Sequence, residues 1–293
     1  MRSYWAMLVR DRVALAAAAF LALVVIVSFG GYAVLGDRAS LQDLLARNRP
    51  PFSLEHGWSY VLGSDVLGRS VLYRLVEAGS TSLSLSMSAA FLAALIGASL
   101  GIAAGYRGGW FDALAMRLAD VILSFPLLLI AILFLYILEP RAGNIVVLLV
   151  IGRLPLYLRV TRAETLEVRK RLFIDAARCL GASGWRLCTR EIAPVVAPTV
   201  LTLVALDVGL LMLLESALSF LGIGLQPPAV SWGGMVSDGR RFIASAWWLS
   251  FFPGLAIFLV ALCCNVFSNW LRLANDPMQR WRLEKTPAAT VPA

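Results

Sequence analysis

The chain has 293 residues, of which 59% are hydrophobic and 15% charged, with a net charge of +8 and a mean hydropathy of +0.78. Soluble globular proteins are about 45–50% apolar and about 25% charged, so this composition excludes an ordinary soluble domain and indicates a polytopic membrane protein. No basic stripe interleaved with aromatic residues accompanies the positive charge, and nucleic-acid binding is therefore not expected.

Six apolar segments are long enough to cross a bilayer, which takes about 20 residues of helix. They are, in chain order, residues 13–35, 83–105, 118–138, 144–160, 195–219 and 248–271. The first exceeds the apolar core of a signal peptide, about 7–15 residues, and we interpret it as a retained anchor. The fifth carries Asp207, whose cost is outweighed by the valines and leucines around it. The pattern predicts an all-α polytopic membrane protein with six transmembrane helices.

These spans divide the chain into an N-terminal segment with the first helix (1–35), an external connection (36–82), a five-helix core (83–271) and a tail (272–293). A polar loop, residues 163–194, interrupts the core. When the N-terminus is placed in the cytoplasm, seventeen of the 26 Lys and Arg residues fall on that side. The positive-inside rule therefore predicts that both termini and the polar loop are cytoplasmic.

The second span holds two patterns. The alternation "STSLSLSMS" (80–88) has a strand-like period of two, but a lone strand leaves its backbone unsatisfied in lipid, so a helix is predicted. Its serines either bond back to preceding carbonyl groups or line a polar path. Gly97, Gly101 and Gly105 repeat every four residues, a spacing that lets membrane helices approach closely. We expect this glycine face to serve helix packing.

Prolines and charges mark the later spans. Pro126 and Pro155 are expected to kink the third and fourth spans. Arg153, Asp207 and Glu215 are intramembrane or near-interface charges, which are candidate functional residues by default. An architectural role is favoured for Glu215. Three interpretations stay open for Asp207: it pairs with Arg153, faces a translocation path, or is protonated.

The polar stretch "FIDAARCLGASGWRLCTREIAP" (173–194) predicts two short helices. Gly181 fits the left-handed position that ends the first helix, and Ser183 can cap the second. Pro194 fits the first turn of the next span, where its missing N–H costs nothing. Helical spacing predicts an apolar face on each piece. The first face comprises Phe173, Ala176, Ala177 and Leu180, and the second comprises Trp185, Cys188 and Ile192.

Two interpretations of this loop are consistent with its physics. It is either an interfacial helix on anionic lipid with Trp185 as its anchor, or a rigid two-helix knob that docks into a groove of another protein.

Aromatic residues and prolines gather near the outer end of the last two spans. Gln226, Pro227 and Pro228 predict an extended external turn. Trp232, Trp247 and Trp248 are expected to be aromatic anchors at the outer membrane interface. No ligand chemistry is predicted from the four cysteines and the single histidine, because they form no C-x-x-C pair or cluster, and we expect no metal site.

Several motifs, in order along residues 60–280, resemble one family. Asp175-Ala176-Ala177, followed by Gly181 and Pro194, resembles the "EAA…G…P" loop of ABC-importer permeases, with Asp175 in place of Glu. "LGSDVLGRSVLYRLVEAGSTSLSLS" (62–86), "GIAAGYRGGWFDALAMRLADVILSFP" (101–126) and "LSFLGIGLQPPAVSWGGMVSDGR" (218–240) are similar to segments of dipeptide, oligopeptide and nickel importer permeases. Within that branch the chain resembles the second, C-type permease.

The resemblance implies a type I ABC-importer permease in the bacterial inner membrane. It implies that the polar loop forms coupling helices that fit a cleft on an ATP-binding subunit. The coupling residues would be Asp175, Ala176, Ala177, Gly181, Trp185 and Pro194. The implied partners are a second, B-type permease, two ATP-binding subunits and an extracytoplasmic solute-binding protein, with residues 225–245 a candidate contact for the last. The glycine face would pack within the permease pair.

The chain itself is not expected to be an enzyme or to bind a cofactor. Its only lysines, Lys170 and Lys285, do not follow a P-loop pattern, so ATP and Mg²⁺ would be bound by the partner subunits, and no catalytic residue is predicted. The branch favours a di- or oligopeptide as solute, with a nickel complex, glutathione or an opine-like compound as alternatives. An ion- or proton-coupled carrier or channel is the alternative of another class, although only Asp207 lies deep in a span.

Overall fold

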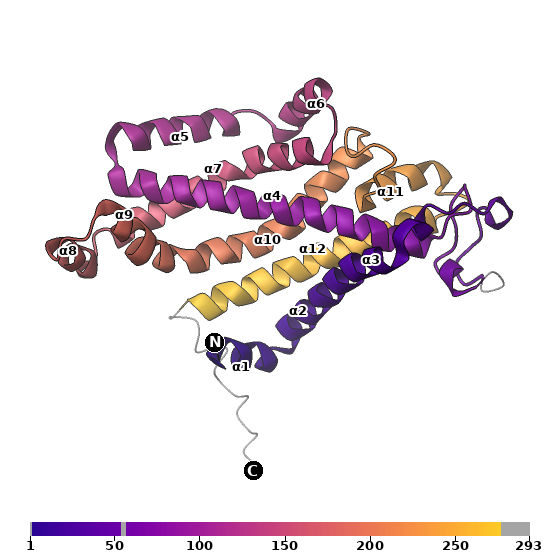
Figure 1. The fold of residues 1–293 in the computed structure, drawn as a ribbon, viewed down its shortest axis with the longest axis horizontal. Coiled ribbons are helices and arrows are strands. Elements are labelled where there is room, and N and C mark those ends of the chain that lie inside the picture. The colour runs from indigo at the N-terminus through magenta and orange to yellow at the C-terminus, as the bar shows by residue number, and fades with distance from the viewer. Residues whose placement is uncertain (1, 54–56, 277–293) are drawn as a thin grey trace, which may run out of the picture.

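The structure is a computed structural model that describes residues 2–53 and 57–276. Its described part is built from helices, with short 3₁₀ turns in the external connection (Figure 1). The helices are α1 (Arg2–Arg10), α2 (Arg12–Val25), α3 (Gly31–Leu35), α4 (Val71–Arg107), α5 (Gly109–Leu123), α6 (Leu127–Leu138), α7 (Ala142–Val168), α8 (Leu172–Cys179), α9 (Gly184–Arg186), α10 (Ala193–Phe220), α11 (Trp232–Gly239) and α12 (Trp248–Asn275). π-helical turns join α2 to α3 (Ile26–Gly30) and α9 to α10 (Leu187–Ile192).

Five helical segments in the described residues are long and apolar enough to cross a membrane, and a sixth crossing exists if the bent pair α5–α6 is one span. The kink predicted at Pro126, within the span over residues 118–138, is present as a sharp break. α5 and α6 meet at an angle of 87°, because the chain breaks at Pro126, which has extended backbone and begins α6. Pro155, in contrast, lies inside the continuous helix α7.

The second span begins earlier than predicted. α4 starts at Val71 rather than at residue 83, so the boundary between the external connection and the core falls inside a helix. The Ser70 hydroxyl accepts a hydrogen bond from the Tyr73 N–H and caps this helix. The helix predicted over residues 80–88 is confirmed. Its serines bond back to preceding carbonyl groups, as Ser86 does to Ser82 at 2.8 Å.

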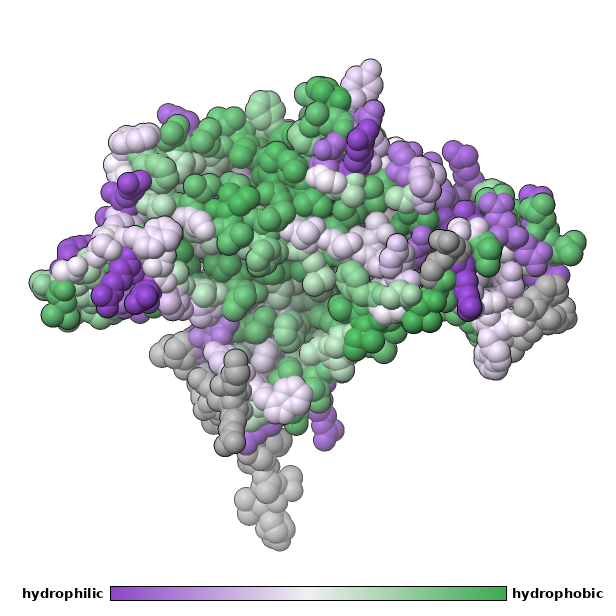
Figure 2. All heavy atoms as spheres, in the orientation of Figure 1, coloured by the Kyte–Doolittle hydropathy of each residue, from purple (hydrophilic) through white to green (hydrophobic). Residues whose placement is uncertain are grey.

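The segments that connect the spans lie at the two opposite ends of the long axis of the molecule (Figure 1). α8, α9 and the turn from α4 to α5 lie at one end, and the 36–70 connection and α11 lie at the other. Hydrophobic residues cover the middle of the molecule in Figure 2, and hydrophilic residues gather at both ends. This arrangement fits a membrane crossed along that axis. Residues 277–293 of the predicted tail lie outside the described residues.

α4 and α7 make the most extensive helix–helix contact in the described part of the chain. Three glycines allow it. A Cβ atom at Gly101 would lie 1.9 Å from Oγ1 of Thr161, and one at Gly97 would lie 2.6 Å from Cβ of Tyr157. Gly105 meets α7 in the same way. The glycine face thus packs inside one chain and not, as expected, between two permeases.

Two of the three tryptophans expected at the membrane interface are buried instead. Trp232 donates from its indole N–H to the Leu75 carbonyl at 2.8 Å, and its backbone N–H donates to the Ser82 hydroxyl at 3.0 Å. Trp248 donates to the Ser64 carbonyl at 3.1 Å. Because a buried indole N–H needs an acceptor, Trp232 joins α11 to α4 and Trp248 joins α12 to the external connection. Trp247, the third of these tryptophans, is exposed as expected.

The external connection is held by one carboxylate. Asp65 is buried and accepts hydrogen bonds from the N–H groups of Leu67 and Arg69, both at 2.9 Å. It also accepts from Arg69 Nε at 2.7 Å and from Arg74 Nη1 at 2.9 Å. Gly68, at φ +74°, passes so close to the Asp43 carbonyl that no side chain would fit. The "GSDVLGRS" segment is therefore a compact structural node.

Candidate functional site

The polar loop projects at one tip of the molecule, where α8 and α9 lie beyond the ends of the spans (Figure 1). α7 ends at Val168, and the Arg169 guanidinium donates to the Gly105 carbonyl at 2.8 Å. This contact ties the start of the loop to the end of α4. The loop therefore leaves the membrane helices from a fixed point.

The turn between α8 and α9 forms as the sequence predicts. Gly181 adopts φ +85°, and the Ala182 N–H donates to the Ala177 carbonyl at 3.1 Å, which is the closing bond of a Schellman motif. Ser183 caps α9 by accepting from the Arg186 N–H at 3.4 Å. A residue with a side chain would be strained at Gly181, although nothing lies within 4 Å of the Cβ position.

A small apolar core fixes the loop to three membrane helices. Ile174, Leu187 and Ile192 are buried there with Val168 of α7 and Val196 of α10. Partly buried residues of α4 and of the loop pack around this cluster. Because these contacts join the loop to α4, α7 and α10, a force applied to the loop is transmitted to the spans rather than absorbed by it.

The side of the loop that faces away from the membrane helices carries exposed apolar side chains. Leu180 is 89% exposed, Leu172 86% and Trp185 80%. Arg178, Arg186 and Arg190 are also exposed. We call these six residues the knob surface. Exposed large apolar side chains of this kind, accompanied by charge, are typical of a surface that contacts either another protein or a membrane.

The predicted apolar faces of the two short helices are partly wrong. Phe173, Ala176 and Leu180 point outward, because Ile174 rather than Phe173 turns into the core. Trp185 is exposed while Ile192 is buried. The π-helical turn Leu187–Ile192 explains this difference, since it has more residues per turn than an α-helix and shifts the side chains that follow.

Two predicted coupling residues differ in their surroundings. The Asp175 side chain is exposed and pairs with Arg178 on the next turn, at 3.4 Å. Such an exposed pair contributes little to stability. Pro194 lies in the first turn of α10, as predicted, but it does not separate two helices. The π-helical turn carries the helix from Gly184 to Phe220 without a break, so α9 and α10 are one rod.

The intramembrane charges lie in two separate places. Arg153 of α7 donates from Nε to Oδ2 of Asp207 at 3.0 Å, and its Nη2 donates to Oδ1. Of the three interpretations of Asp207, the structure shows the ion pair. Glu215 is buried nearer the outer end and accepts from the Ser219 hydroxyl at 2.8 Å. The Glu215 carboxylate lies between α10 and Ser231, the residue that caps the start of α11.

An outer groove of about 340 Å³ lies beside the Asp65 node. Arg69 of the connection and Arg74 of α4 line one side of it, and Asp238, Arg240 and Arg241 line it from the 225–245 segment. The Arg240 guanidinium lies over the Phe220 ring, 4.8 Å from its centroid. We did not predict this node from the sequence, although the aspartate and two arginines within ten residues were a usable signal.

No group of three or more His, Cys, Asp and Glu side chains that could hold a metal ion occurs in the described ranges 2–53 and 57–276. The arrangement instead combines an exposed docking surface at one end with a charged groove at the other. Such an arrangement can bind partner proteins at both ends of a membrane-spanning bundle.

Comparison with known proteins gives a family match and relatives that align over most of the chain. The sequence model of one family, described as binding-protein-dependent transport system inner membrane component, matches residues 97–281. The chain is 33% identical over 277 residues to the glutathione transport system permease protein GsiD of Pectobacterium atrosepticum, an alignment that covers 94% of this chain and 90% of that protein. It is 34% identical over 275 residues to the GsiD protein of Shigella sonnei, covering 94% and 89% of the two chains.

Proposed function

The chain belongs to the family of binding-protein-dependent transport system inner membrane components, the permease subunits of ABC importers, and we propose that its knob surface docks on an ATP-binding subunit. It is a multi-pass protein of the bacterial inner membrane. The observation that carries the proposal is the exposure of Leu172, Leu180 and Trp185 at the tip of a loop whose other side is rigidly packed.

The rigid packing supports a mechanical role for the loop. The small core at Ile174, Leu187 and Ile192 joins it to α4, α7 and α10, and α9 continues into α10 as one rod. When two ATP-bound subunits close, the knob surface moves with them and the spans tilt between inward-open and outward-open arrangements. ATP shifts this equilibrium only because the ATP-binding subunits contact the loop differently in the two states.

The chain acts with other subunits in this proposal. A second permease completes the translocation path, and two ATP-binding subunits hold ATP and Mg²⁺ and carry out hydrolysis. A solute-binding protein delivers the solute to the outer end, where the groove formed by the Asp65 node and residues 235–242 offers charged contacts. The permease itself performs no chemical step.

We propose a small peptide as the solute, and glutathione as the first peptide to test. The relatives GsiD of Pectobacterium atrosepticum and Shigella sonnei are named as glutathione transport permeases. Glutathione is itself a tripeptide, so it falls within the class that the sequence motifs favour.

The test is a single exposed substitution at each end of the molecule. Leu180→Glu places a carboxylate in the knob surface without disturbing the buried side of the loop. Leu45→Glu, the control, introduces the same charge at the opposite end of the molecule, where Leu45 is 86% exposed. In proteoliposomes that contain the complete importer, Leu180→Glu should lower ATP-driven glutathione uptake about tenfold or more, since an apolar interface anchor contributes over about 2 kcal/mol. Leu45→Glu should leave uptake intact. Equal uptake in both variants would contradict the proposal.

A further inference from the structure

One helix of the bundle carries a polar stripe within its apolar length. Along the inner half of α12, polar side chains recur with helical spacing, so they share one face. They are Asn265, Ser268, Asn269, Arg272 and Asn275. From Asn265 to Asn275 the helix rises about 15 Å, which is half of a hydrocarbon core of about 30 Å. The stripe therefore reaches from the inner surface to near the middle of the membrane.

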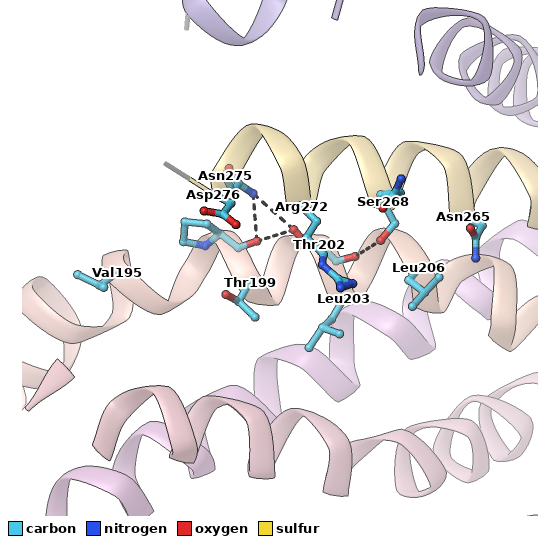
Figure 3. Close-up of a pocket in the computed structure, with 12 residues that line it drawn as sticks. Val195, Thr199, Thr202, Leu203, Leu206, Asn265, Ser268, Arg272, Asn275 and Asp276 are labelled. Atoms are coloured by element: carbon cyan, nitrogen blue, oxygen red, sulfur yellow. Dashed lines mark hydrogen bonds between the residues drawn. The ribbon is translucent and has the colours of Figure 1, made fainter. Parts of the chain in front are cut away.

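The stripe faces α10 across a groove of about 570 Å³ (Figure 3). Ser268 donates to the Thr202 carbonyl at 2.8 Å, and Asn275 donates to the Pro198 carbonyl at 3.3 Å. These bonds hold α12 to α10 along the floor of the groove. Its volume lies in the range of about 300–1,000 Å³ that is usual for small-molecule sites.

Two amide side chains of the groove make no hydrogen bond within the described part of the chain. Asn265 and Asn269 are exposed, and the described part of the chain provides no hydrogen-bonding partner for either side chain. Polar side chains at this depth face a water-filled cavity or the interior of a bundle, because contact with lipid tails is costly. The inner half of the groove is therefore suited to water and a polar solute.

Arg272 supplies the positive charge of the groove. Its side chain extends from α12 toward Leu203 of α10 in Figure 3, and no carboxylate of residues 2–53 or 57–276 forms an ion pair with it. Asp276 lines the mouth of the groove one turn further on. A guanidinium that pairs with no carboxylate of the described residues, beside the amide groups of Asn265 and Asn269, matches a carboxylate with neighbouring peptide groups.

The outer half of the same two helices has the opposite character. A second groove of about 590 Å³ begins at Asn265 and is lined mainly by apolar residues, among them Leu213, Phe220, Ile257 and Phe258. An apolar groove suits a helix of the second permease, whereas the polar inner half does not. The change of lining at Asn265 thus separates a packing surface from a solute path.

We infer that the groove between α10 and α12 forms this chain's share of the inner solute path, and that Arg272 binds a carboxylate of the solute. This inference rests on the proposed importer function. It names the solute class as a small molecule that carries a carboxylate and amide groups, and it assigns Asn265, Asn269 and Arg272 as its contacts.

The first test measures water and charge in the groove directly. In inside-out vesicles with the assembled importer, and with the four native cysteines of this chain replaced by alanine, Asn269→Cys is treated with small anionic and cationic methanethiosulfonate reagents. Asn269→Cys should react with both reagents and faster with the anionic one, and Arg272→Gln should lower that preference severalfold. Phe258→Cys, on the apolar half, should react with neither. An unreactive Asn269→Cys would mean that the second permease covers the groove, and would overturn the inference.

The second test measures transport. Arg272→Gln should lower glutathione uptake about tenfold, the loss expected for one charge-assisted hydrogen bond, and Arg272→Lys should retain most of it. Arg12→Gln, which removes an exposed arginine of α2 outside the groove, is the matched control. If Arg12→Gln has the same effect, or if the loss follows the content of anionic lipid, Arg272 serves the membrane surface and the inference fails.

Two variants distinguish a failure of the docking surface from a failure of the solute site. Leu180→Glu should lose the ATP-binding subunit and keep the anionic preference at Asn269→Cys. Arg272→Gln should keep the ATP-binding subunit, detected by co-purification, and lose the preference. An unchanged preference in Arg272→Gln contradicts the solute site alone.

Discussion

Asp207 of α10 is fully buried and accepts two hydrogen bonds from the Arg153 guanidinium of α7. The pair joins two helices that both lead into the polar loop. A carboxylate and a guanidinium with matched geometry satisfy each other's hydrogen bonds and offset part of the cost of burial. The ion pair therefore fixes the relative position of α7 and α10 within the bundle.

Removing one partner of this pair should destabilise the subunit. Asp207→Asn leaves the guanidinium without its countercharge, at a cost of about 3–5 kcal/mol, so the midpoint of thermal aggregation in detergent should fall and less complex should assemble. The double variant Arg153→Gln/Asp207→Asn should recover much of the loss, because no unpaired charge remains. If Asp207→Asn lowers uptake but leaves stability unchanged, the aspartate belongs to the solute path and not to the bundle.

The close contact of α4 and α7 predicts strong intolerance at Gly101. Gly101→Ala places a methyl group 1.9 Å from Oγ1 of Thr161 and 2.6 Å from the Leu158 carbonyl, so the helices must separate at a cost of about 1–3 kcal/mol. Gly143→Ala is the matched control, since nothing lies within 4 Å of that position and alanine favours helix. Thermal stability should fall in the first variant only, and equal stability would show that α4 and α7 are further apart.

The left-handed turn at Gly181 predicts a graded loss of coupling. Asparagine and aspartate tolerate this backbone conformation better than a β-branched residue, so Gly181→Asn and Gly181→Asp should each retain more uptake than Gly181→Val. The last change costs about 1–2 kcal/mol locally and re-aims the knob surface. All three proteins should still insert in the membrane.

Gly222 provides the control for Gly181. It has φ +82° and open space around its Cβ position, and it follows α10 at the outer end. Gly222→Val should carry similar backbone strain while the ATP-binding subunit still co-purifies with the permease. Loss of that subunit in both variants would attribute the effect to general instability and not to the loop.

The Asp65 node predicts local unfolding at the outer end. Asp65→Asn leaves buried Arg74 without its closest countercharge, a loss of about 3–5 kcal/mol, and the 36–70 connection should become sensitive to protease added from outside. Glu139→Gln removes an exposed carboxylate that pairs with Arg141 and should change protease sensitivity little. A resistant Asp65→Asn protein would refute the structural role of the node.

Local features of the polar loop were predictable from the sequence because they depend on neighbouring residues alone. Gly181, Ser183 and Pro194 take the turn, cap and first-turn positions that their chemistry favours. The direction of Trp185 was not predictable, since a π-helical turn inserted after it changes the helical register. Only packing against the ends of α4 and α7 selects that turn.

The start of α4 and the angle between α5 and α6 depend on tertiary contacts, which the sequence pattern does not reveal. Arg74 and Glu77 made residues 71–82 look like part of a polar connection, yet the Asp65 carboxylate and the Trp232 indole hold this stretch as helix. Pro126 signalled a kink, but the 87° break between α5 and α6 depends on how each packs on α7. Sequence periodicity carries no information about such angles.

Photo-cross-linking measures whether residues 172–186 contact an ATP-binding subunit in the assembled importer. A benzoylphenylalanine at position 180 in the assembled importer should form a covalent adduct with the ATP-binding subunit when illuminated, and the yield should change when ATP is bound. The same probe at position 45, in the external connection, should yield no such adduct. Adducts from position 180 with lipid alone, or with the solute-binding protein, would show that the knob surface does not dock on the ATP-binding subunit.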